Sequence, residues 1–218
     1  PIEYHLPNVT QSQVDGKKEY NFASGLKAML RHDPDIILIG EIRDHDTARL
    51  AIEAAQTGHL VFSSLHSNSS VGAISRLRNL GIDNFNIASS INAIFGQRLV
   101  RTLCKDCKRE IDAEYPPQIQ VLAEKNKVDL PKKMYESVGC EKCGHTGFVG
   151  RTTITEVLFF DKFLSGLVTE NEPEHDIKQT LVEEKDYQTL IVDGIRKVAE
   201  GETSIAELLR IVSLREDE

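Results

Sequence analysis

The sequence predicts an α/β protein with a parallel-sheet core, an insert that binds a metal ion and a helical C-terminal region. Three observations support this fold class. Two short apolar runs, residues 36–39 and 60–65, lie on either side of a segment with helical spacing, which is typical of a parallel strand–helix–strand unit. Four cysteines form two CxxC pairs, a spacing that suits metal binding. Beyond residue 158, apolar residues recur at helical intervals.

Length and composition are those of a globular protein. The chain has 218 residues, 40% hydrophobic and 28% charged, enough for one core with an appendage or for two small domains. No apolar run approaches the roughly 20 residues of a membrane-spanning helix. The first residues, PIEYHLPNV, lack the basic and apolar segments of a secretory signal. Because they also lack an initiator methionine, we expect the chain to be a C-terminal piece of a longer protein.

Charge and cysteine usage narrow the function classes. The formal net charge of -8 disfavours a nucleic-acid-binding surface, because phosphate backbones select basic faces. A nucleic-acid translocase is further disfavoured by the absence of tryptophan and an aromatic content of 6%, which leave few residues to stack on bases. Paired cysteines without a secretory signal indicate a reducing compartment and metal binding rather than disulfides.

The first predicted helix and strand follow each other directly. Asn21 is placed to cap a helix over residues 21–31, whose apolar residues share one face. Pro34 ends this helix. The branched apolar residues 36–39 then predict a short strand that is buried on both faces.

The second predicted helix and strand complete the parallel unit. The helix is expected to begin at Asp44 or Asp46, to have an alanine-rich interior and to end just before Gly58. The run at residues 60–65 predicts a second buried strand, which ends at His66.

After residue 66 the sequence predicts two helices, then a loop-rich insert, and then a strand followed by helices. Two further helices are expected at residues 71–80 and 84–95. Prolines, glycines and the paired cysteines predict a loop-rich insert, and a short strand near residues 152–158 should follow it. One stripe of the C-terminal helices contains Leu190, Ile191, Ile195 and Val198. We therefore expect three regions: a core over 1–103, a tetracysteine subdomain over 104–151, and a strand with helices over 152–218.

An acidic residue follows the first predicted strand. Glu41 lies where a parallel strand would end, and an acidic residue there commonly holds a nucleotide-bound Mg²⁺. The phosphate-binding loop that would complete such a site needs a glycine, four residues, and Gly-Lys-Ser/Thr. Here Gly16 and Lys17 are followed by Lys18, and Gln11 stands in place of the first glycine. The sequence therefore lacks this loop.

The four cysteines are the strongest local signal. Cys104 and Cys107 form one CxxC pair, and Cys140 and Cys143 form the other. Together they can complete a tetrahedral zinc shell with Zn–S distances of about 2.3 Å. Because all four positions would be filled by protein, such a zinc ion would be structural. A redox dithiol or an iron–sulfur cluster is the alternative. His145 lies just beyond the second pair, where the sequence favours a surface histidine in a glycine-rich turn over a ligand that replaces one cysteine.

Four stretches of sequence together resemble the secretion ATPases of type II secretion and type IV pilus assembly, over nearly the whole chain. ILIGEIRD resembles their Walker B box, and TGHLVFSSLH resembles their His box. PIEY corresponds to the end of their acidic Asp box. QRLVRTLC, which leads into the cysteines, is similar to the subset with a zinc subdomain. The resemblance implies a RecA-like core, of which the Walker A part would lie upstream.

The resemblance also implies roles for individual residues. Glu3 matches the glutamate that orients or deprotonates the attacking water, and Glu41 would act on the Mg²⁺ side. His66 would contact the γ-phosphate or sense its loss, while His59 and Arg43 would help to bind the nucleotide. A helix cap is the alternative role for Glu41, and a merely polar strand-end position is the alternative for His66.

An arginine from a neighbouring subunit often contacts the phosphates in such enzymes. The candidates here are Arg43, Arg76, Arg78, Arg98 and Arg101.

The function that the resemblance implies is ATP hydrolysis with Mg²⁺ by the intact protein. That protein would form a hexameric ring and work with platform or anchoring proteins of the inner membrane, so it would be cytoplasmic and peripheral to that membrane. Lacking the phosphate loop, these residues alone are expected to be inactive. The alternative is a non-catalytic docking module that contains zinc and binds a membrane-anchored partner. No direct nucleic-acid partner is expected.

Overall fold

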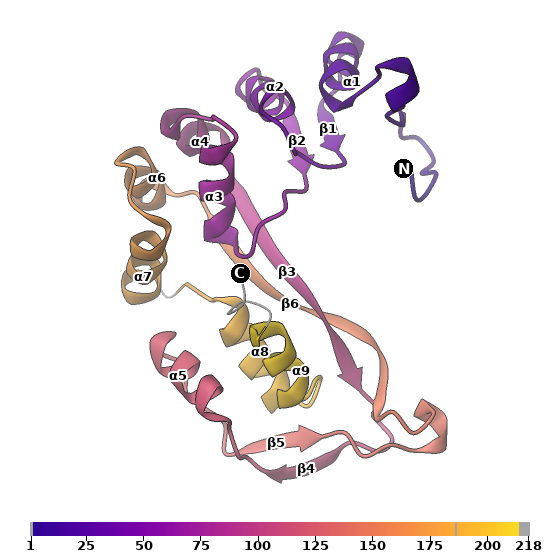
Figure 1. Ribbon diagram of the computed structural model, residues 1–218, viewed down its shortest axis with the longest axis vertical. Helices are drawn as coiled ribbons and strands as arrows, with labels where there is room; N and C mark the ends of the chain where they lie inside the picture. The colour runs from indigo at the N-terminus through magenta and orange to yellow at the C-terminus, as the bar shows by residue number, and fades with distance from the viewer. Residues whose placement is uncertain (1, 186, 214–218) are drawn as a thin grey trace. The chain divides into compact units, whose positions relative to one another are not determined.

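The computed structural model describes residues 2–185 and 187–213 and divides into two compact units, whose helices and strands are labelled in Figure 1. Unit 1 is formed by Pro1–Ser67, Gly72–Asn92 and Phe160–Glu174. Unit 2 is formed by Asn68–Val71, Ala93–Phe159 and His175–Glu218. The predicted α/β class is confirmed, because helices alternate with a parallel strand pair in unit 1 and pack on antiparallel strands in unit 2.

The centre of unit 1 is the predicted strand–helix–strand unit. Strand β1 (Ile36–Ile39) pairs in parallel with β2 (Leu60–Ser63), with Ile36 opposite Leu60. Helix α2 (His45–Gln56) connects them, as a parallel pair requires. The carboxylate of Asp44 caps α2 by accepting the Thr47 N–H at 2.8 Å, which confirms the predicted helix start.

The prediction that both strands are buried on both faces is wrong. Ile37 and Ile39 are 3% and 5% exposed, because α1 and α2 pack on their side of the strands. Apolar side chains on the opposite face remain accessible to solvent among the described residues. They are Ile36, Leu38, Leu60 and Phe62, with exposures of 63%, 73%, 44% and 51%.

Helix α1 (Phe22–Met29) begins at the expected cap. Asn21 Oδ1 accepts the Ser24 N–H at 2.8 Å, and Ser24 Oγ accepts the Asn21 N–H at 2.9 Å, so the two residues form a capping box. A 3₁₀ turn, η2 (Leu30–His32), continues the helix to the residues before Pro34. A second 3₁₀ turn, η1 (Gly16–Lys18), precedes α1.

Unit 1 also contains α4 (Asn84–Ser90), α6 (Lys162–Thr169) and α3 (Ser70–Asn79) from Gly72 onward, since the first two residues of α3 belong to unit 2. Helix α4 is shorter than the predicted helix over residues 84–95. Ile91 leaves the helical region with a ψ of 128°, and from there the side chains alternate between two faces. This alternation has the period of a strand.

Unit 2 is built on a long antiparallel pair. Strand β3 (Ala93–Leu103) pairs with β6 (Phe148–Phe159), with Ala93 opposite Phe159 and Leu103 opposite Phe148. The predicted strand near residues 152–158 is therefore only the later part of β6, which begins at Phe148. Strand β6 is longer because β3, which the sequence did not indicate, offers hydrogen-bonding partners along its whole length.

The insert between β3 and β6 contains a second antiparallel pair. Strand β4 (Arg109–Asp112) pairs with β5 (Lys133–Glu136), and helix α5 (Pro117–Lys125) lies between them in the chain. The 3₁₀ turn η3 (Glu141–Cys143) carries the second cysteine pair.

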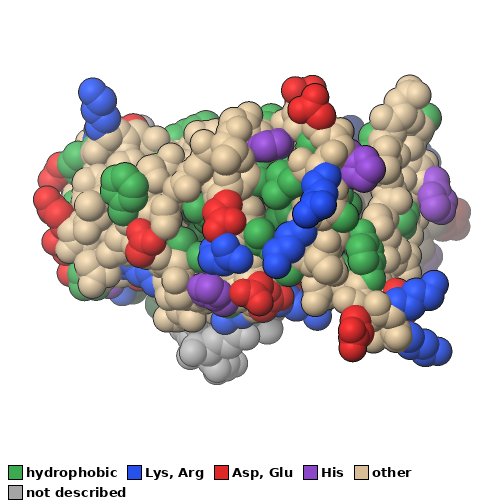
Figure 2. Space-filling model, turned by 90° about the horizontal axis from the view of Figure 1, so that it is seen from above, with side chains coloured by type: hydrophobic (Ala, Val, Ile, Leu, Met, Phe, Trp, Pro, Cys, Tyr) green, Lys and Arg blue, Asp and Glu red, His purple; other side chains and the backbone are tan. Residues whose placement is uncertain are grey.

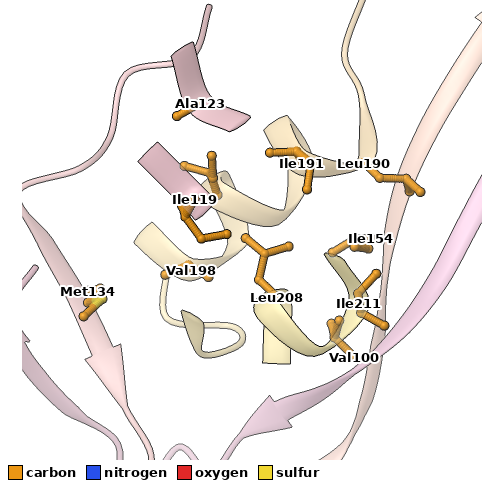
Figure 3. Close-up of a cluster of buried hydrophobic side chains, with 11 residues drawn as sticks. Val100, Ile119, Ala123, Met134, Ile154, Leu190, Ile191, Val198, Leu208 and Ile211 are labelled. Carbon is orange, nitrogen blue, oxygen red and sulfur yellow. The ribbon is translucent and has the colours of Figure 1, made fainter. Parts of the chain in front are cut away.

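Helices α7 (Glu174–Glu184), α8 (Leu190–Ala199) and α9 (Ile205–Ser213) form the predicted helical C-terminal region. The predicted apolar stripe of α8 is buried and packs against α5, α9 and β6. Figure 3 shows Ile119, Val198 and Leu208 converging from α5, α8 and α9. The core of unit 2 therefore joins the insert to the C-terminal helices.

Candidate functional site

Two loops meet at the carboxyl edge of the parallel strands in unit 1. The Ile42 N–H donates to the Ser64 carbonyl at 2.9 Å, and Ser64 Oγ donates to the Gly40 carbonyl at 2.6 Å. These bonds fasten the loop after β1 to the loop after β2. Ligands of open α/β sheets gather at such edges, so this pair of loops is the first place to seek a site.

Glu41, Arg43 and His66 come together on these loops. Glu41 Oε2 accepts a hydrogen bond from Arg43 Nε at 2.5 Å and lies 3.5 Å from His66 Nε2. The Glu41 side chain is 21% exposed, while those of Arg43 and His66 are 68% and 81% exposed. A half-sheltered carboxylate beside two accessible nitrogen donors can hold a hydrated cation and contact phosphate oxygens.

The alternative role of Glu41 as a helix cap is not what the structure shows. Asp44 occupies the cap of α2, and its second oxygen accepts the Thr47 hydroxyl at 3.1 Å. Glu41 is therefore available for a ligand.

His59 lies at the other end of β2 from His66. Its Nδ1 is 2.9 Å from the Ala54 carbonyl and 3.2 Å from the Thr57 hydroxyl, so the ring fastens the end of α2 to the start of the strand. The structure thus does not bring His59 together with Glu41, Arg43 and His66.

Glu3 is exposed, and the described residues include no hydrogen bond or ion pair to its carboxylate. The side chain of Gln11 is hydrogen-bonded to the backbone of the segment that follows Glu3. The Gln11 side-chain amide donates to the Tyr4 carbonyl at 3.0 Å and accepts the Leu6 N–H at 2.9 Å. In this structure Glu3 and Glu41 are thus not joined by any described contact.

Sequence reasoning missed Ser64, although it fastens the two loops. The signal available was a polar pair, Ser63 and Ser64, directly after the apolar start of β2. A hydroxyl at the end of a parallel strand can reach the neighbouring loop, but the spacing alone does not say which carbonyl it meets.

Two of the candidate arginines are used within the fold. Arg78 donates to the carbonyls of Glu172 and Val168, at 2.9 and 3.2 Å, at the end of α6. Arg101 Nη2 lies 2.6 Å from Glu207 Oε1 in unit 2. These contacts give both side chains a structural role, so Arg43 has the better placement for a phosphate.

The four cysteines of unit 2 form a second candidate site. The Sγ atoms of Cys104 and Cys140 are 3.9 Å apart, those of Cys107 and Cys143 are 4.0 Å apart, and all four lie within 4.8 Å of one another. Tetrahedral coordination with Zn–S bonds of about 2.3 Å places the sulfurs roughly 3.8 Å apart. The donor set therefore fits a tetrahedral zinc ion held entirely by protein.

Backbone N–H groups donate hydrogen bonds to a sulfur of the second cysteine pair. The N–H groups of Cys140 and Gly147 each donate to Cys143 Sγ at 3.2 Å. The bond from Cys140 contributes most to lowering the pKa of Cys143, to about 6. Gly139 has a φ of +106°, and a Cβ there would lie 2.7 Å from the His145 carbonyl. The turn therefore requires glycine and favours a thiolate.

His145 is not among the clustered metal-binding atoms of the described residues, which come from the cysteines alone. It adopts a positive φ of 61° in the turn, and its N–H donates to the Cys140 carbonyl at 2.9 Å. The residue thus shapes the turn through its backbone.

Figure 2 shows acidic, basic and histidine side chains intermingled with apolar ones on the face that it draws. Among the helices of residues 2–185 and 187–213, none combines the length and apolar character needed to cross a bilayer.

The chain is similar to proteins of known secretion and pilus systems. Residues 1–210 match the family described as Type II/IV secretion system protein. The chain is 43% identical to the type II secretion system protein E of Aeromonas hydrophila and 43% identical to the type II secretion system ATPase E of Vibrio cholerae. The alignments cover 100% and 97% of this chain, but only 42% and 41% of those proteins. The type IV pilus assembly ATPase PilB of Thermus thermophilus is 39% identical over 96% of this chain and 23% of its own length.

Two solved structures share the fold. The ATPase DotB of Legionella pneumophila has a TM-score of 0.62 at 23% identity, over 93% of this chain and 45% of DotB. The pilus retraction motor PilT with bound ADP has a TM-score of 0.59 at 22% identity, over 88% of this chain and 43% of PilT. The predicted α/β fold is thereby confirmed, with the ATPases DotB and PilT as structural neighbours. With a matched family over residues 1–210 and relatives above 40% identity, this chain belongs to the type II/IV secretion system protein family.

Proposed function

We propose that this chain is the C-terminal part of an ATPase that powers type II secretion or type IV pilus assembly. The observation that carries the proposal is the group formed by Glu41, Arg43 and His66 at the carboxyl edge of the parallel strands. A carboxylate and two phosphate-binding side chains are the functional groups that this reaction needs at that edge.

Each residue has a distinct role in the proposed reaction. Glu41 would help to hold Mg²⁺, which would supply positive charge beside the phosphates, and Arg43 and His66 would contact phosphate oxygens as charge develops on them. Glu3 orients or deprotonates the attacking water. His59 supports the strand that leads to His66 rather than touching the nucleotide. The phosphate-binding loop, absent from these 218 residues, comes from a preceding part of the protein.

The four cysteines hold a structural zinc ion in this proposal. When bound, zinc supplies a tetrahedral cross-link and no open coordination position for chemistry. Cys104 and Cys107 follow the end of β3, while Cys140 and Cys143 precede β6, so the cross-link closes the insert between the two strands.

The assembly is part of the same proposal. Subunits form a hexameric ring on the cytoplasmic side of the inner membrane and act through platform or anchoring proteins there, without a direct nucleic-acid partner. The family membership and the similarity to proteins named for secretion and pilus assembly support this assignment.

ATP hydrolysis by two forms of the protein tests the proposal. The first form is this chain alone, and the second is extended upstream to include a phosphate-binding loop. We expect hydrolysis only in the extended form and a loss of at least about 100-fold in its Glu3→Gln and Glu41→Gln variants. An extended form without activity contradicts the motor.

A docking module is the second candidate function. The observation that favours it is that the cysteine centre lies within these residues while the phosphate loop does not. In that case metal removal abolishes binding to a membrane-anchored partner of the secretion or pilus machine. Glu41→Gln leaves that binding unchanged, which separates the two functions.

A further inference from the structure

Ser64 is hydrogen-bonded to the chain on both sides of Glu41. It directly follows β2, and its Oγ donates to the Gly40 carbonyl at 2.6 Å. Its own carbonyl accepts the Ile42 N–H at 2.9 Å. Gly40 and Ile42 are the two neighbours of Glu41 in the chain. One serine therefore holds both peptide groups that flank the carboxylate proposed to bind Mg²⁺.

The side-chain partners of Glu41 restrain it less than this backbone attachment does. Arg43 Nε and His66 Nε2 lie 2.5 and 3.5 Å from Glu41 Oε2, but their side chains are 68% and 81% exposed. Ion pairs between such exposed groups are weak, because water competes for them and the side chains lose rotamer freedom when they pair. The position of the Glu41 main chain, which Ser64 holds, therefore limits where the carboxylate can lie.

Ser64 also links Glu41 to His66 within one compact unit. Residues 36–66 all belong to unit 1. His66 follows Ser64 by two residues, which span at most about 7 Å when extended. The imidazole thus projects from the same short segment that holds the Glu41 backbone. The 3.5 Å separation of Glu41 Oε2 and His66 Nε2 depends on this attachment.

We propose that Ser64 is a positioning residue for Glu41. Its hydroxyl fixes the peptide group before Glu41 and its carbonyl fixes the one after, so the carboxylate is directed toward His66 before a nucleotide binds. The inference rests on the proposed ATPase function and adds a positioning residue to that site. Ser64 acts through Glu41 and has no contact of its own with the nucleotide in this account.

Three substitutions separate positioning from general stability. Ser64→Ala removes the hydroxyl but keeps the carbonyl, and because Ser64 is exposed it leaves no buried cavity. Ser64→Thr keeps the hydroxyl, and its methyl group suits the extended chain at the end of a strand. Ser63→Ala is the matched control. It removes the hydroxyl of the preceding exposed serine, whose described hydrogen bond goes to the Ser64 carbonyl at 3.3 Å rather than to a neighbour of Glu41.

The first measurement is the exchange rate of the Ile42 amide, followed by NMR in the 218-residue chain without nucleotide. We expect this amide to exchange at least about fivefold faster in Ser64→Ala than in Ser63→Ala, because the loop after β1 can then separate from the loop after β2. Ser64→Thr should retain the wild-type rate. Equal rates in Ser64→Ala and Ser63→Ala overturn the proposal.

The second measurement is ATP hydrolysis by the form extended upstream. We expect Ser64→Ala to lower kcat about tenfold while KM for ATP changes less than about twofold, because a displaced catalytic group costs rate more than binding. Ser64→Thr and Ser63→Ala should stay within about twofold of wild type. In a Glu41→Gln background, followed by single-turnover hydrolysis, Ser64→Ala should cause no further loss.

Each contrary outcome has its own meaning. If the effects of Ser64→Ala and Glu41→Gln multiply, Ser64 acts independently of Glu41 and the proposal is wrong. It is also wrong if Ser64→Thr is as slow as Ser64→Ala, because the hydroxyl is then not the positioning group. If kcat is unchanged in Ser64→Ala while the wild type is active, only this inference fails. If the wild-type extended form does not hydrolyse ATP, the proposed function fails and the inference falls with it.

Discussion

Glu207 shows how this fold keeps a charged residue in a core. It is 1% exposed, and it accepts the Arg101 N–H at 3.0 Å and the Arg101 guanidinium at 2.6 Å. Burial alone would raise the pKa of Glu207, but the hydrogen bonds from Arg101 outweigh it and lower the pKa to about 2. The charged pair fastens α9 to β3.

This pair predicts a pH-dependent loss of stability. Because the pKa is lowered in the folded state, the stabilisation is complete above the unfolded pKa of about 4.3 and is lost as the pH falls toward 2. We expect Glu207→Gln to cost about 2 kcal/mol at pH 7, a modest value because the Arg101 side chain is 52% exposed.

Urea denaturation of both proteins between pH 7 and pH 3 measures the effect. The difference between wild type and Glu207→Gln should be constant above about pH 5 and shrink below it. A difference that stays the same down to pH 3 would contradict the assignment.

At the residue scale, the sequence indicated candidate side chains for the proposed nucleotide site, but it did not indicate the hydrogen bonds that fasten the surrounding segments. Glu41 and His66 were identified because each follows an apolar strand, and their meeting at 3.5 Å depends on two parallel strands ending together. Ser64, Glu156 and Glu207 were missed because a lone serine or glutamate has no spacing that predicts its partner.

Among the elements, the turn between α8 and α9 is hydrogen-bonded to residues that adjoin the cysteine centre. Leu103, next to Cys104, donates its N–H to the Glu202 carbonyl at 2.8 Å. Lys108, next to Cys107, donates from Nζ to the Gly201 carbonyl at 2.7 Å and lies over the Tyr135 ring at 4.6 Å. A lysine at this carbonyl also neutralises the negative end of the α8 dipole.

Metal removal should therefore loosen a turn that contains no cysteine. We expect chelation to lower Tm by at least about 5 °C and to speed amide exchange over residues 200–206. Lys108→Met should bind metal as wild type does, but should show faster exchange in that turn. Lys105→Met, an exposed lysine of the same CxxC turn, is the matched control.

The measurements are metal content, thermal melts and hydrogen exchange with and without chelator. Unchanged stability after complete metal removal would exclude a structural zinc ion. A turn that stays protected in the chelated protein would show that α8 and α9 do not depend on the centre.

Element prediction succeeded where local signals were strong. The caps at Asn21 and Asp44 and the apolar stripe of α8 correspond to the observed helices. Strand β3 was not predicted, and a helix was expected over its first residues because helix and strand patterns overlap around residues 91–95. There the pairing with β6 decides the conformation.

In the whole molecule, the two-stranded parallel sheet of unit 1 leaves one apolar face accessible. Parallel sheets of α/β proteins are normally covered on both faces. Leu38 is 73% exposed on this face, whereas the adjacent Ile37 is 3% exposed on the other. If the chain is part of a longer ATPase, the accessible face is where further structure would pack.

Two neighbouring substitutions test this. In the 218-residue chain, we expect Ile37→Ala to cost about 3 kcal/mol and Leu38→Ala less than about 0.5 kcal/mol. In the form extended upstream, Leu38→Ala should cost about 2 kcal/mol or more because its side chain becomes buried. Urea denaturation followed by circular dichroism gives these values, and a cost for Leu38→Ala that is equally small in both forms would contradict a completed sheet.

The sequence by itself determined the fold class, the helix caps, the paired cysteines and the acidic and histidine residues at the strand ends. Caps and CxxC pairs act over a few residues, so their spacing can be recognised along the chain. Only the tertiary structure decided which face of β1 is accessible, where β3 runs, and which carboxylates hold the elements together. The Glu156 bond to Ser70 joins residues 86 apart, and the Glu207 bond to Arg101 joins residues 106 apart. Such contacts depend on how segments that are distant in the chain pack together. Neither residue of such a pair stands at a sequence spacing from which its partner could be predicted.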